Sequence, residues 1–145
     1  RGRGLTRRGG SVTATILYIE DNADNLLLVR RALEARGYRV VEAVDGAAGL
    51  EQVERERPDV VLLDINLPDV DGYEVVRRLR ANPAWKSLPV VAITAKALPG
   101  DAERALTAGC DLYMSKPIAV RALWAALERI LSAQPKAEAE RFVSD

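Results

Sequence analysis

The 145-residue sequence has no histidine, one cysteine and no apolar run near the ~18 residues that a membrane span needs. Without histidine it cannot form a Ser–His or Cys–His catalytic couple, use histidine as a metal ligand, or carry phosphohistidine itself. Cys110 alone cannot form an internal disulfide, so nothing indicates an oxidising compartment. Since no signal-peptide pattern is present either, we expect a soluble cytoplasmic protein with no membrane partner.

The charges balance over the whole chain, with 21 basic and 21 acidic residues, but their distribution is uneven. Four arginines and no acid lie within the first ten residues, at Arg1, Arg3, Arg7 and Arg8. The rest of the chain is therefore mildly acidic, which argues against nucleic-acid binding by the folded part.

The length is that of one ordinary domain. Residues 1–13 are rich in Gly and Arg and lack periodicity, and we interpret them as a flexible N-terminal arm or a remnant of cloning. Residues 133–145 are polar and broken by Pro135, which indicates a C-terminal tail or linker. The folded unit is expected over 14–132.

Within that unit, short apolar runs alternate with helical patterns five times, which predicts an α/β fold with a parallel sheet covered by helices on both faces. For five such units the common strand order is 2-1-3-4-5, a flavodoxin-like doubly wound sheet. The expected helices cover roughly 23–36, 46–57, 72–82, 100–108 and 118–132. The expected strands are Thr15–Glu20, Arg39–Val44, Asp59–Asp64, Pro89–Ala95 and Asp111–Lys116.

Polar residues stand at the carboxyl ends of these strands, the edge at which such folds bind ligands. Glu20 and Asp21 follow the first strand and Asp64 ends the third, so three carboxylates are expected to converge, with Thr94 and Lys116 beside them. Two carboxylates about 4 Å apart repel by roughly 4 kcal/mol at an effective dielectric near 20, so the site must hold a proton or a cation.

Oxygen ligands alone favour Mg²⁺ or Mn²⁺. Lys116 supplies a second positive charge for a phosphoryl group, and Asp64 is placed to be the nucleophile that forms an aspartyl phosphate. Thr94 could donate a hydrogen bond to the phosphoryl oxygen.

Over about residues 14–132 the sequence resembles the receiver domain of two-component response regulators, the CheY-like family. The resemblance is carried by 16–22 (ILYIEDN), 62–68 (LLDINLP) with Asp71-Gly72 after it, 90–95 (VVAITA) and 113–117 (YMSKP). The segments around Gly100, Gly109 and Ser115 also resemble stand-alone receivers of the DivK type and receiver modules of hybrid histidine kinases.

The resemblance implies a role for each residue at the strand ends. Asp64 corresponds to the phosphoacceptor, and Asp21, Asp64 and the backbone carbonyl of Asn66 correspond to the metal ligands. Glu20 stands where many members have Asp and corresponds to the acid that acts through water.

Further roles follow from the same resemblance. Lys116 matches the phosphate-binding lysine, Thr94 and Tyr113 match the switch residues, and the bond between Lys116 and Pro117 is a candidate cis peptide. Asn66 and Lys96 stand where the family tunes the lifetime of the phosphoryl group.

The function expected is therefore a phosphorylation-controlled signalling module and not an enzyme acting on other molecules. A partner histidine kinase or histidine phosphotransfer protein would supply the phosphoryl group, because this chain has no histidine. Thr94 and Tyr113 would then change the face formed by the fourth helix, fifth strand and fifth helix, which alters binding of a downstream protein target. A homodimer is left open.

Two other interpretations remain open. A phosphatase of the haloacid dehalogenase type also uses an aspartate nucleophile with Mg²⁺, but it needs an acid two residues later, where this chain has Asn66, and its nucleophile is expected on the first strand. A receiver-like scaffold that is never phosphorylated is the other.

Overall fold

The structure is a computed structural model, and it describes residues 6–8, 11–95 and 98–144. Five parallel strands form the central sheet: β3 (Thr15–Ile19), β4 (Arg39–Ala43), β5 (Val60–Asp64), β6 (Val90–Thr94) and β7 (Leu112–Ser115). Their order is β4-β3-β5-β6-β7, which confirms the predicted order 2-1-3-4-5.

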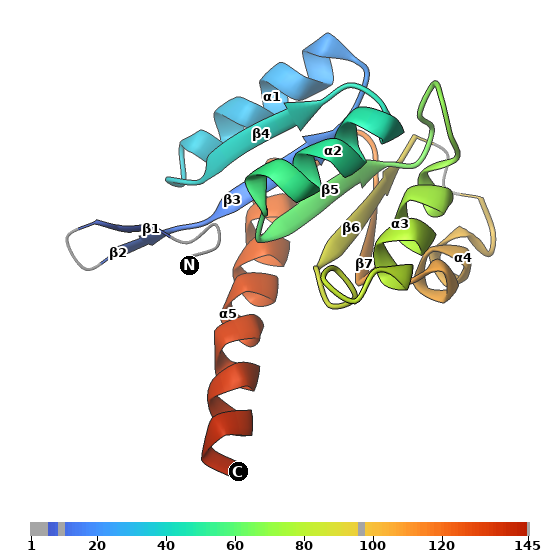
Figure 1. The fold of residues 1–145 in the computed structure, drawn as a ribbon. Helices are drawn as coiled ribbons and strands as arrows, with labels where there is room; N and C mark the ends of the chain where they lie inside the picture. Colours follow the sequence, from blue (N-terminus) through green and yellow to red (C-terminus); the bar gives the residue numbers. More distant parts are fainter. Residues whose placement is uncertain (1–5, 9–10, 96–97, 145) are drawn as a thin grey trace.

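Helices cover both faces of this sheet, as Figure 1 shows. The helices α1 (Ala23–Glu34) and α5 (Val120–Ser144) pack on one face. The other face is covered by α2 (Gly46–Glu56), α3 (Gly72–Ala81) and α4 (Asp101–Ala108). A doubly wound α/β sandwich of this kind is the fold class that the alternating sequence pattern predicts.

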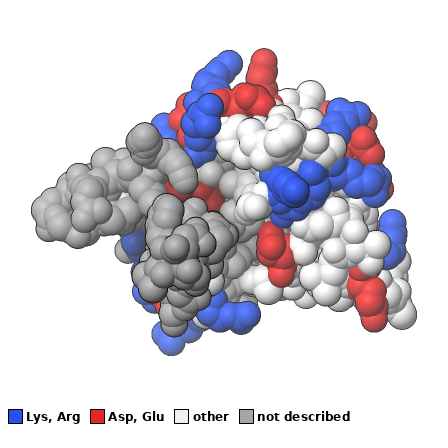
Figure 2. Space-filling model, turned by 60° about the horizontal axis from the view of Figure 1, so that its bottom comes forward, with Lys and Arg blue, Asp and Glu red and all other residues white. Residues whose placement is uncertain are grey.

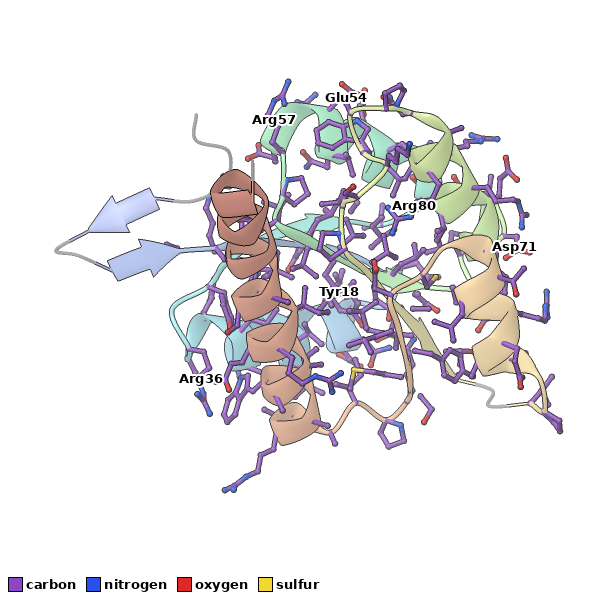
Figure 3. All side chains as sticks on the ribbon, turned by 90° about the horizontal axis from the view of Figure 1, so that it is seen from below. Tyr18, Arg36, Glu54, Arg57, Asp71 and Arg80 are labelled. Carbon is purple, nitrogen blue, oxygen red and sulfur yellow. The ribbon has the colours of Figure 1, made fainter. Side chains whose placement is uncertain are left out.

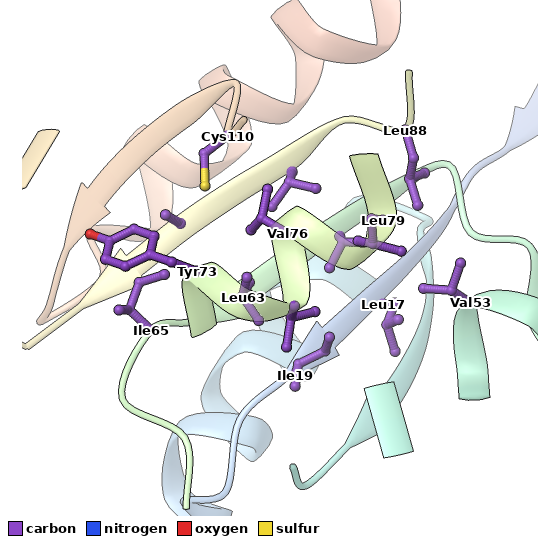
Figure 4. Packing of buried hydrophobic residues seen from close by; sticks show 14 of the residues in the cluster. Leu17, Ile19, Val53, Leu63, Ile65, Tyr73, Val76, Leu79, Leu88 and Cys110 are labelled. Atoms are coloured by element: carbon purple, nitrogen blue, oxygen red, sulfur yellow. The ribbon is translucent and has the colours of Figure 1, made fainter. Parts of the chain in front are cut away.

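The apolar runs form strands because they lie between these two helical layers. Every residue of β3, β5 and β6 is buried, so the strands do not alternate apolar with polar residues. Successive side chains enter opposite cores: Leu17 and Ile19 pack under α2 and α3 (Figure 4), whereas Ile16 and Tyr18 pack under α1 and α5.

Helices α1, α2 and α3 begin at side-chain caps on the same edge of the sheet as the strand ends. Asn22 caps α1 through the Asn25 amide, Asp45 caps α2 through the Ala48 amide, and Asp71 caps α3 through the Tyr73 amide. Each cap satisfies one of the four amides that a helix leaves unbonded at its N-terminus. The caps thus fix the turns that connect the strand ends to the helices.

On the α1 and α5 face, Trp124 joins the two helices. Its indole Nε1 donates to the Ala32 carbonyl over 2.8 Å, and the Arg36 guanidinium lies 4.0 Å from the centre of its ring. This contact secures the start of α5 against the end of α1.

The edge of the sheet away from the strand ends carries basic and acidic side chains side by side over its described part (Figure 2).

The structure differs from the sequence expectation at both ends of the chain. Thr6–Arg8 (β1) and Ser11–Thr13 (β2) pair as an antiparallel hairpin, although residues 1–13 were expected to lack regular structure. Thr and Val favour strands, and Gly9-Gly10 between them is a pair common in two-residue connections.

Helix α5 continues to Ser144, through residues 133–144 that were expected to form a tail. Ala, Glu, Lys and Arg dominate this stretch and are strong helix formers, which outweighs the break expected at Pro135. Within the described residues no helix is both long enough and apolar enough to cross a membrane.

Gly72, the first residue of α3, lies against the backbone of the loop that follows β5. A β-carbon at this position would come within 2.6 Å of the Ile65 Cα and 3.0 Å of the Asp64 carbonyl oxygen. The Gly72 amide also donates to the Ile65 carbonyl over 3.0 Å. Only glycine lets α3 begin this close to Asp64.

We predict that Gly72→Ala lowers the free energy of unfolding by about 1–3 kcal/mol, because backbone atoms cannot move aside as a flexible side chain can. Urea denaturation followed by circular dichroism measures the change. An Ala variant as stable as the parent chain would show that the contact between α3 and this loop is not tight.

Candidate functional site

The sheet brings the predicted residues to one edge. Ile19 is level with Leu63, so Glu20 and Asp21 follow β3 where Asp64 ends β5. Thr94 ends the next strand, β6, and is level with Ser115 at the end of β7, after which Lys116 follows. The parallel order thus gathers residues that are up to 96 positions apart in the sequence.

Glu20, Asp21 and Asp64 form a cluster of acids. One carboxylate oxygen from each lies within 4.8 Å of those of the other two. Glu20 and Asp64 are 1% and 3% exposed, whereas Asp21 is exposed to solvent. Two of the three acids are therefore withdrawn from water, and the third faces solvent.

Lys116 is the cation that contacts this cluster. Its Nζ lies 2.8 Å from Glu20 Oε1 and 3.2 Å from Asp64 Oδ2. Burial opposes the charge on Lys116, but the two carboxylates outweigh it and raise the pKa of the ammonium. Lys116 therefore stays charged and is shared by the acids of two strands.

Glu20 is held by four donors. Tyr18 Oη, Lys116 Nζ and Asn25 Nδ2 donate to Oε1 over 2.9, 2.8 and 3.3 Å, and the Asn22 amide donates to Oε2 over 3.1 Å. Burial acts to raise the pKa of Glu20, but hydrogen bonds from its neighbours, with Lys116 foremost, hold the pKa below its ordinary value. Glu20 is thus a buried carboxylate that stays ionised.

The pKa of Asp64 shifts in the opposite direction to that of Glu20. Burial is the largest influence on it, and together with the neighbouring Glu20 carboxylate it raises the pKa to about 6. The Asn66 amide, which donates to Oδ1 over 2.9 Å, and the Lys116 ammonium act in the other direction. Because its pKa is raised, the ionised form of Asp64 is disfavoured, and a further positive charge nearby would stabilise it.

Of the remaining predicted residues, Asn66 and Thr94 lie next to this cluster. Thr94 Oγ1 donates to Asn66 Oδ1 over 3.4 Å, and the bond between Lys116 and Pro117 is cis, as predicted. Tyr113 packs against the core under α3 and α4, and its buried hydroxyl has no hydrogen-bond partner among the described residues. Lys96 lies outside the described residues.

An open depression of about 380 Å³ adjoins Thr94 and Asn66. It runs from the loop after β5 to the first turns of α3 and α4. Ile65, Asn66, Leu67, Asp71, Tyr73, Thr94, Leu98, Asp101 and Arg104 line it. Thr94 therefore stands between the acid cluster on one side and this depression on the other.

The donor set fits a hard divalent cation. Three carboxylates face one ammonium, so the cluster keeps an excess of negative charge, and oxygen is the ligand that Mg²⁺ and Mn²⁺ prefer. The exposed Asp21 leaves the cluster open toward solvent, as a site needs if the ion is to keep waters and admit a phosphate oxygen.

Sequence reasoning did not single out Tyr18, Asn25 or Asp69. Tyr18 and Asn25 bind Glu20, and Asp69 accepts the Gly46 and Ala47 amides at the start of α2 over 2.8 and 3.0 Å. The aromatic ring in an otherwise aliphatic strand was a usable signal for Tyr18. No sequence signal connects Asp69 to α2, because the two lie together only in the folded chain.

Comparisons with known proteins agree with this geometry. Residues 16–128 match the response regulator receiver domain family. The chain is similar to the polar-differentiation response regulator DivK of Brucella anthropi, with 41% identity over 106 residues, 73% of this chain and 86% of that protein.

Solved structures give the same result. A CheY-like receiver domain protein of Methanospirillum hungatei has a TM-score of 0.80 at 29% identity, covering 86% of this chain and 98% of that one. The receiver domain of a sensor histidine kinase of Pseudomonas aeruginosa, with magnesium ion coordinated in its active site cleft, has a TM-score of 0.77 at 38% identity, covering 83% and 98%.

Receiver domains are signalling modules and not classical enzymes, and they bind Mg²⁺ through acidic residues such as those gathered here. A kinase that donates from histidine and a downstream target are their general partners. By its sequence, its fold and its acidic edge, the chain belongs to the response regulator receiver domain family and is a phosphate-accepting signalling module of two-component systems.

Proposed function

We propose that Asp64 accepts a phosphoryl group from a phosphohistidine of a partner kinase or phosphotransfer protein. The observation that carries the proposal is the Lys116 ammonium, which lies against Asp64 within a cluster of three acids. A carboxylate oxygen of Asp64 forms a bond to phosphorus as the bond between phosphorus and the donor nitrogen breaks, and the donor imidazole leaves with that electron pair.

Asp21, Asp64 and the Asn66 carbonyl would hold Mg²⁺ or Mn²⁺, with Glu20 acting through water. The ion supplies positive charge to the transferring phosphoryl oxygens. Lys116 supplies the second charge, and it turns from Glu20 Oε1 and Asp64 Oδ2 to a phosphoryl oxygen. The chain in this way promotes its own phosphorylation. A water molecule that attacks phosphorus at the same site would break the bond to the Asp64 oxygen, release inorganic phosphate and restore the Asp64 carboxylate.

Thr94 and Tyr113 would pass the change to the surface. A phosphoryl oxygen on Asp64 competes with Asn66 Oδ1 for the Thr94 hydroxyl, so Thr94 would move toward Asp64. Tyr113 has a buried hydroxyl that is unpaired among the described residues, a state that costs about 1–3 kcal/mol, so a rearrangement around it is favourable.

The surface affected is the face of α4, β7 and α5. Leu98 before α4 and Leu106 within it are 59% and 55% exposed, which suits a protein target or a second copy of the chain. The cytoplasmic location predicted from the sequence remains part of this proposal.

We predict that incubation of the chain with acetyl phosphate and Mg²⁺ adds the mass of one phosphoryl group, and that Asp64→Asn abolishes this adduct because the amide cannot act as the nucleophile. Intact-mass spectrometry measures both. Asp59→Asn makes the same change at the other end of the strand and should leave the adduct unchanged, since Asp59 accepts the Thr15 amide away from the site. An undiminished adduct in Asp64→Asn would contradict the assignment.

Lys116→Met should slow phosphorylation by acetyl phosphate on the order of 10²-fold, since one preorganised charge on the transferring group is lost. The initial rate of adduct formation at saturating Mg²⁺ is the measurement. Lys86→Met, an exposed lysine in the turn before β6, serves as the control. Equal rates in Lys116→Met and the parent chain would remove Lys116 from the mechanism.

Mg²⁺ should stabilise the folded chain by about 2.7 kcal/mol when its free concentration is 100 times the dissociation constant. Asp21→Asn is expected to remove most of this gain at the same concentration, whereas Asp24→Asn, outside the acid cluster, should retain it. Urea denaturation with and without Mg²⁺ tests the difference, and equal stabilisation of the two variants would exclude Asp21 as a ligand.

A further inference from the structure

Tyr18 stands in the middle of β3 among aliphatic residues and is 0% exposed. It lies in the interior of the molecule, within the core under α1 and α5 (Figure 3). Its hydroxyl donates to Glu20 Oε1 over 2.9 Å. The two residues are two positions apart in an extended chain, so their side chains leave the same face of the sheet.

Three donors meet at this one oxygen of Glu20. Lys116 Nζ approaches it to 2.8 Å, Tyr18 Oη to 2.9 Å and Asn25 Nδ2 to 3.3 Å. The other partner of Lys116, Asp64 Oδ2, is farther away at 3.2 Å. In the unphosphorylated chain, Lys116 is thus drawn to Glu20 at least as strongly as to Asp64.

The contact between Lys116 and Glu20 opposes phosphoryl transfer unless other donors keep Glu20 Oε1 bonded. When Lys116 turns to a phosphoryl group on Asp64, Glu20 Oε1 loses its closest partner, although the carboxylate remains 1% exposed. A buried carboxylate without donors is strongly disfavoured. Three donors stay: the Asn22 amide on Oε2, and Tyr18 and Asn25 on Oε1. Asn25 is the more distant of the two on Oε1, at 3.3 Å against 2.9 Å, which leaves the Tyr18 hydroxyl as the principal donor to that oxygen.

We propose that Tyr18 is a positioning residue for phosphoryl transfer: its hydroxyl keeps Glu20 bonded and oriented when Lys116 turns from Glu20 to the phosphoryl group on Asp64. This inference rests on the function proposed above. A neutral hydroxyl suits the role, because it satisfies Glu20 without adding a charge that would compete with Lys116 for the phosphoryl oxygens.

The test is Tyr18→Phe, which keeps the ring and removes only the hydroxyl. The initial rate of phosphorylation by acetyl phosphate at saturating Mg²⁺ should fall about tenfold, the scale of one hydrogen bond to a charged group. In the metal-free protein, the NMR signals of the Asn22 backbone amide and the Asn25 side-chain amide should shift, because both groups bind the same carboxylate.

Tyr38→Phe is the matched control. Tyr38 packs against the same core but precedes β4, at the edge of the sheet away from the acids, so its variant should keep the parent rate and the parent signals of Asn22 and Asn25. Glu20→Gln gives the second comparison. When Tyr18→Phe is added to Glu20→Gln, the rate should change little further, because the neutral amide of the new glutamine holds Lys116 weakly.

The outcomes are distinct. If the parent chain is phosphorylated and Tyr18→Phe matches its rate, or if Tyr18→Phe slows the reaction equally with and without Glu20→Gln, the positioning role is wrong. A parent chain that accepts no phosphoryl group would overturn the proposed function together with this inference. A slow Tyr18→Phe variant with shifted Asn22 and Asn25 signals and no further loss in Glu20→Gln supports it.

Discussion

The mutual repulsion of Glu20, Asp21 and Asp64 is the constraint around which the rest of this edge is built. Their oxygens lie within 4.8 Å of one another, and the contacting ammonium of Lys116 balances only part of the charge. Burial withdraws Glu20 and Asp64 from the solvent that would screen them. Such a cluster is stable because fixed donors surround Glu20, and it stays receptive to a divalent cation because Asp64 is less well supplied with donors.

The parallel sheet is what makes this crowding possible. Each strand runs in the same direction, so every strand ends at the same edge, and the connecting turns can bring donors there too. The loop after β5 is held at several points: the Asn66 amide donates to Asp64, Asp69 accepts the first two amides of α2, and Gly72 lies against Ile65. This loop carries the carbonyl that is proposed as a metal ligand, so the start of α2 helps to fix the geometry of the site.

Sequence patterns predicted the fold and most of the site because both depend on short, local signals. Buried strands appear as apolar runs, and the residue after each run lies at the reactive edge, which located Asp64, Thr94 and Lys116 without coordinates. The partners of Glu20 were not predicted, because an apolar strand position such as Tyr18 gives no indication of which way its hydroxyl points. The hairpin β1–β2 and the long α5 were missed since Gly and Pro suggested breaks that local propensity outweighed.

Glu20 shows how geometry refines a role taken from resemblance. Its position implied an acid that reaches a metal through water, but its Oε1 is already bonded to Lys116, Tyr18 and Asn25, and its Oε2 receives the Asn22 amide. A carboxylate so fully bonded has little capacity left for direct coordination. Its negative charge would still attract a cation bound to the cluster, and its closest contact is Lys116, the residue proposed to bind the phosphoryl group. Glu20 therefore contacts Lys116 directly and would act on a bound metal only by its charge, which is why the Tyr18 hydroxyl that donates to it matters.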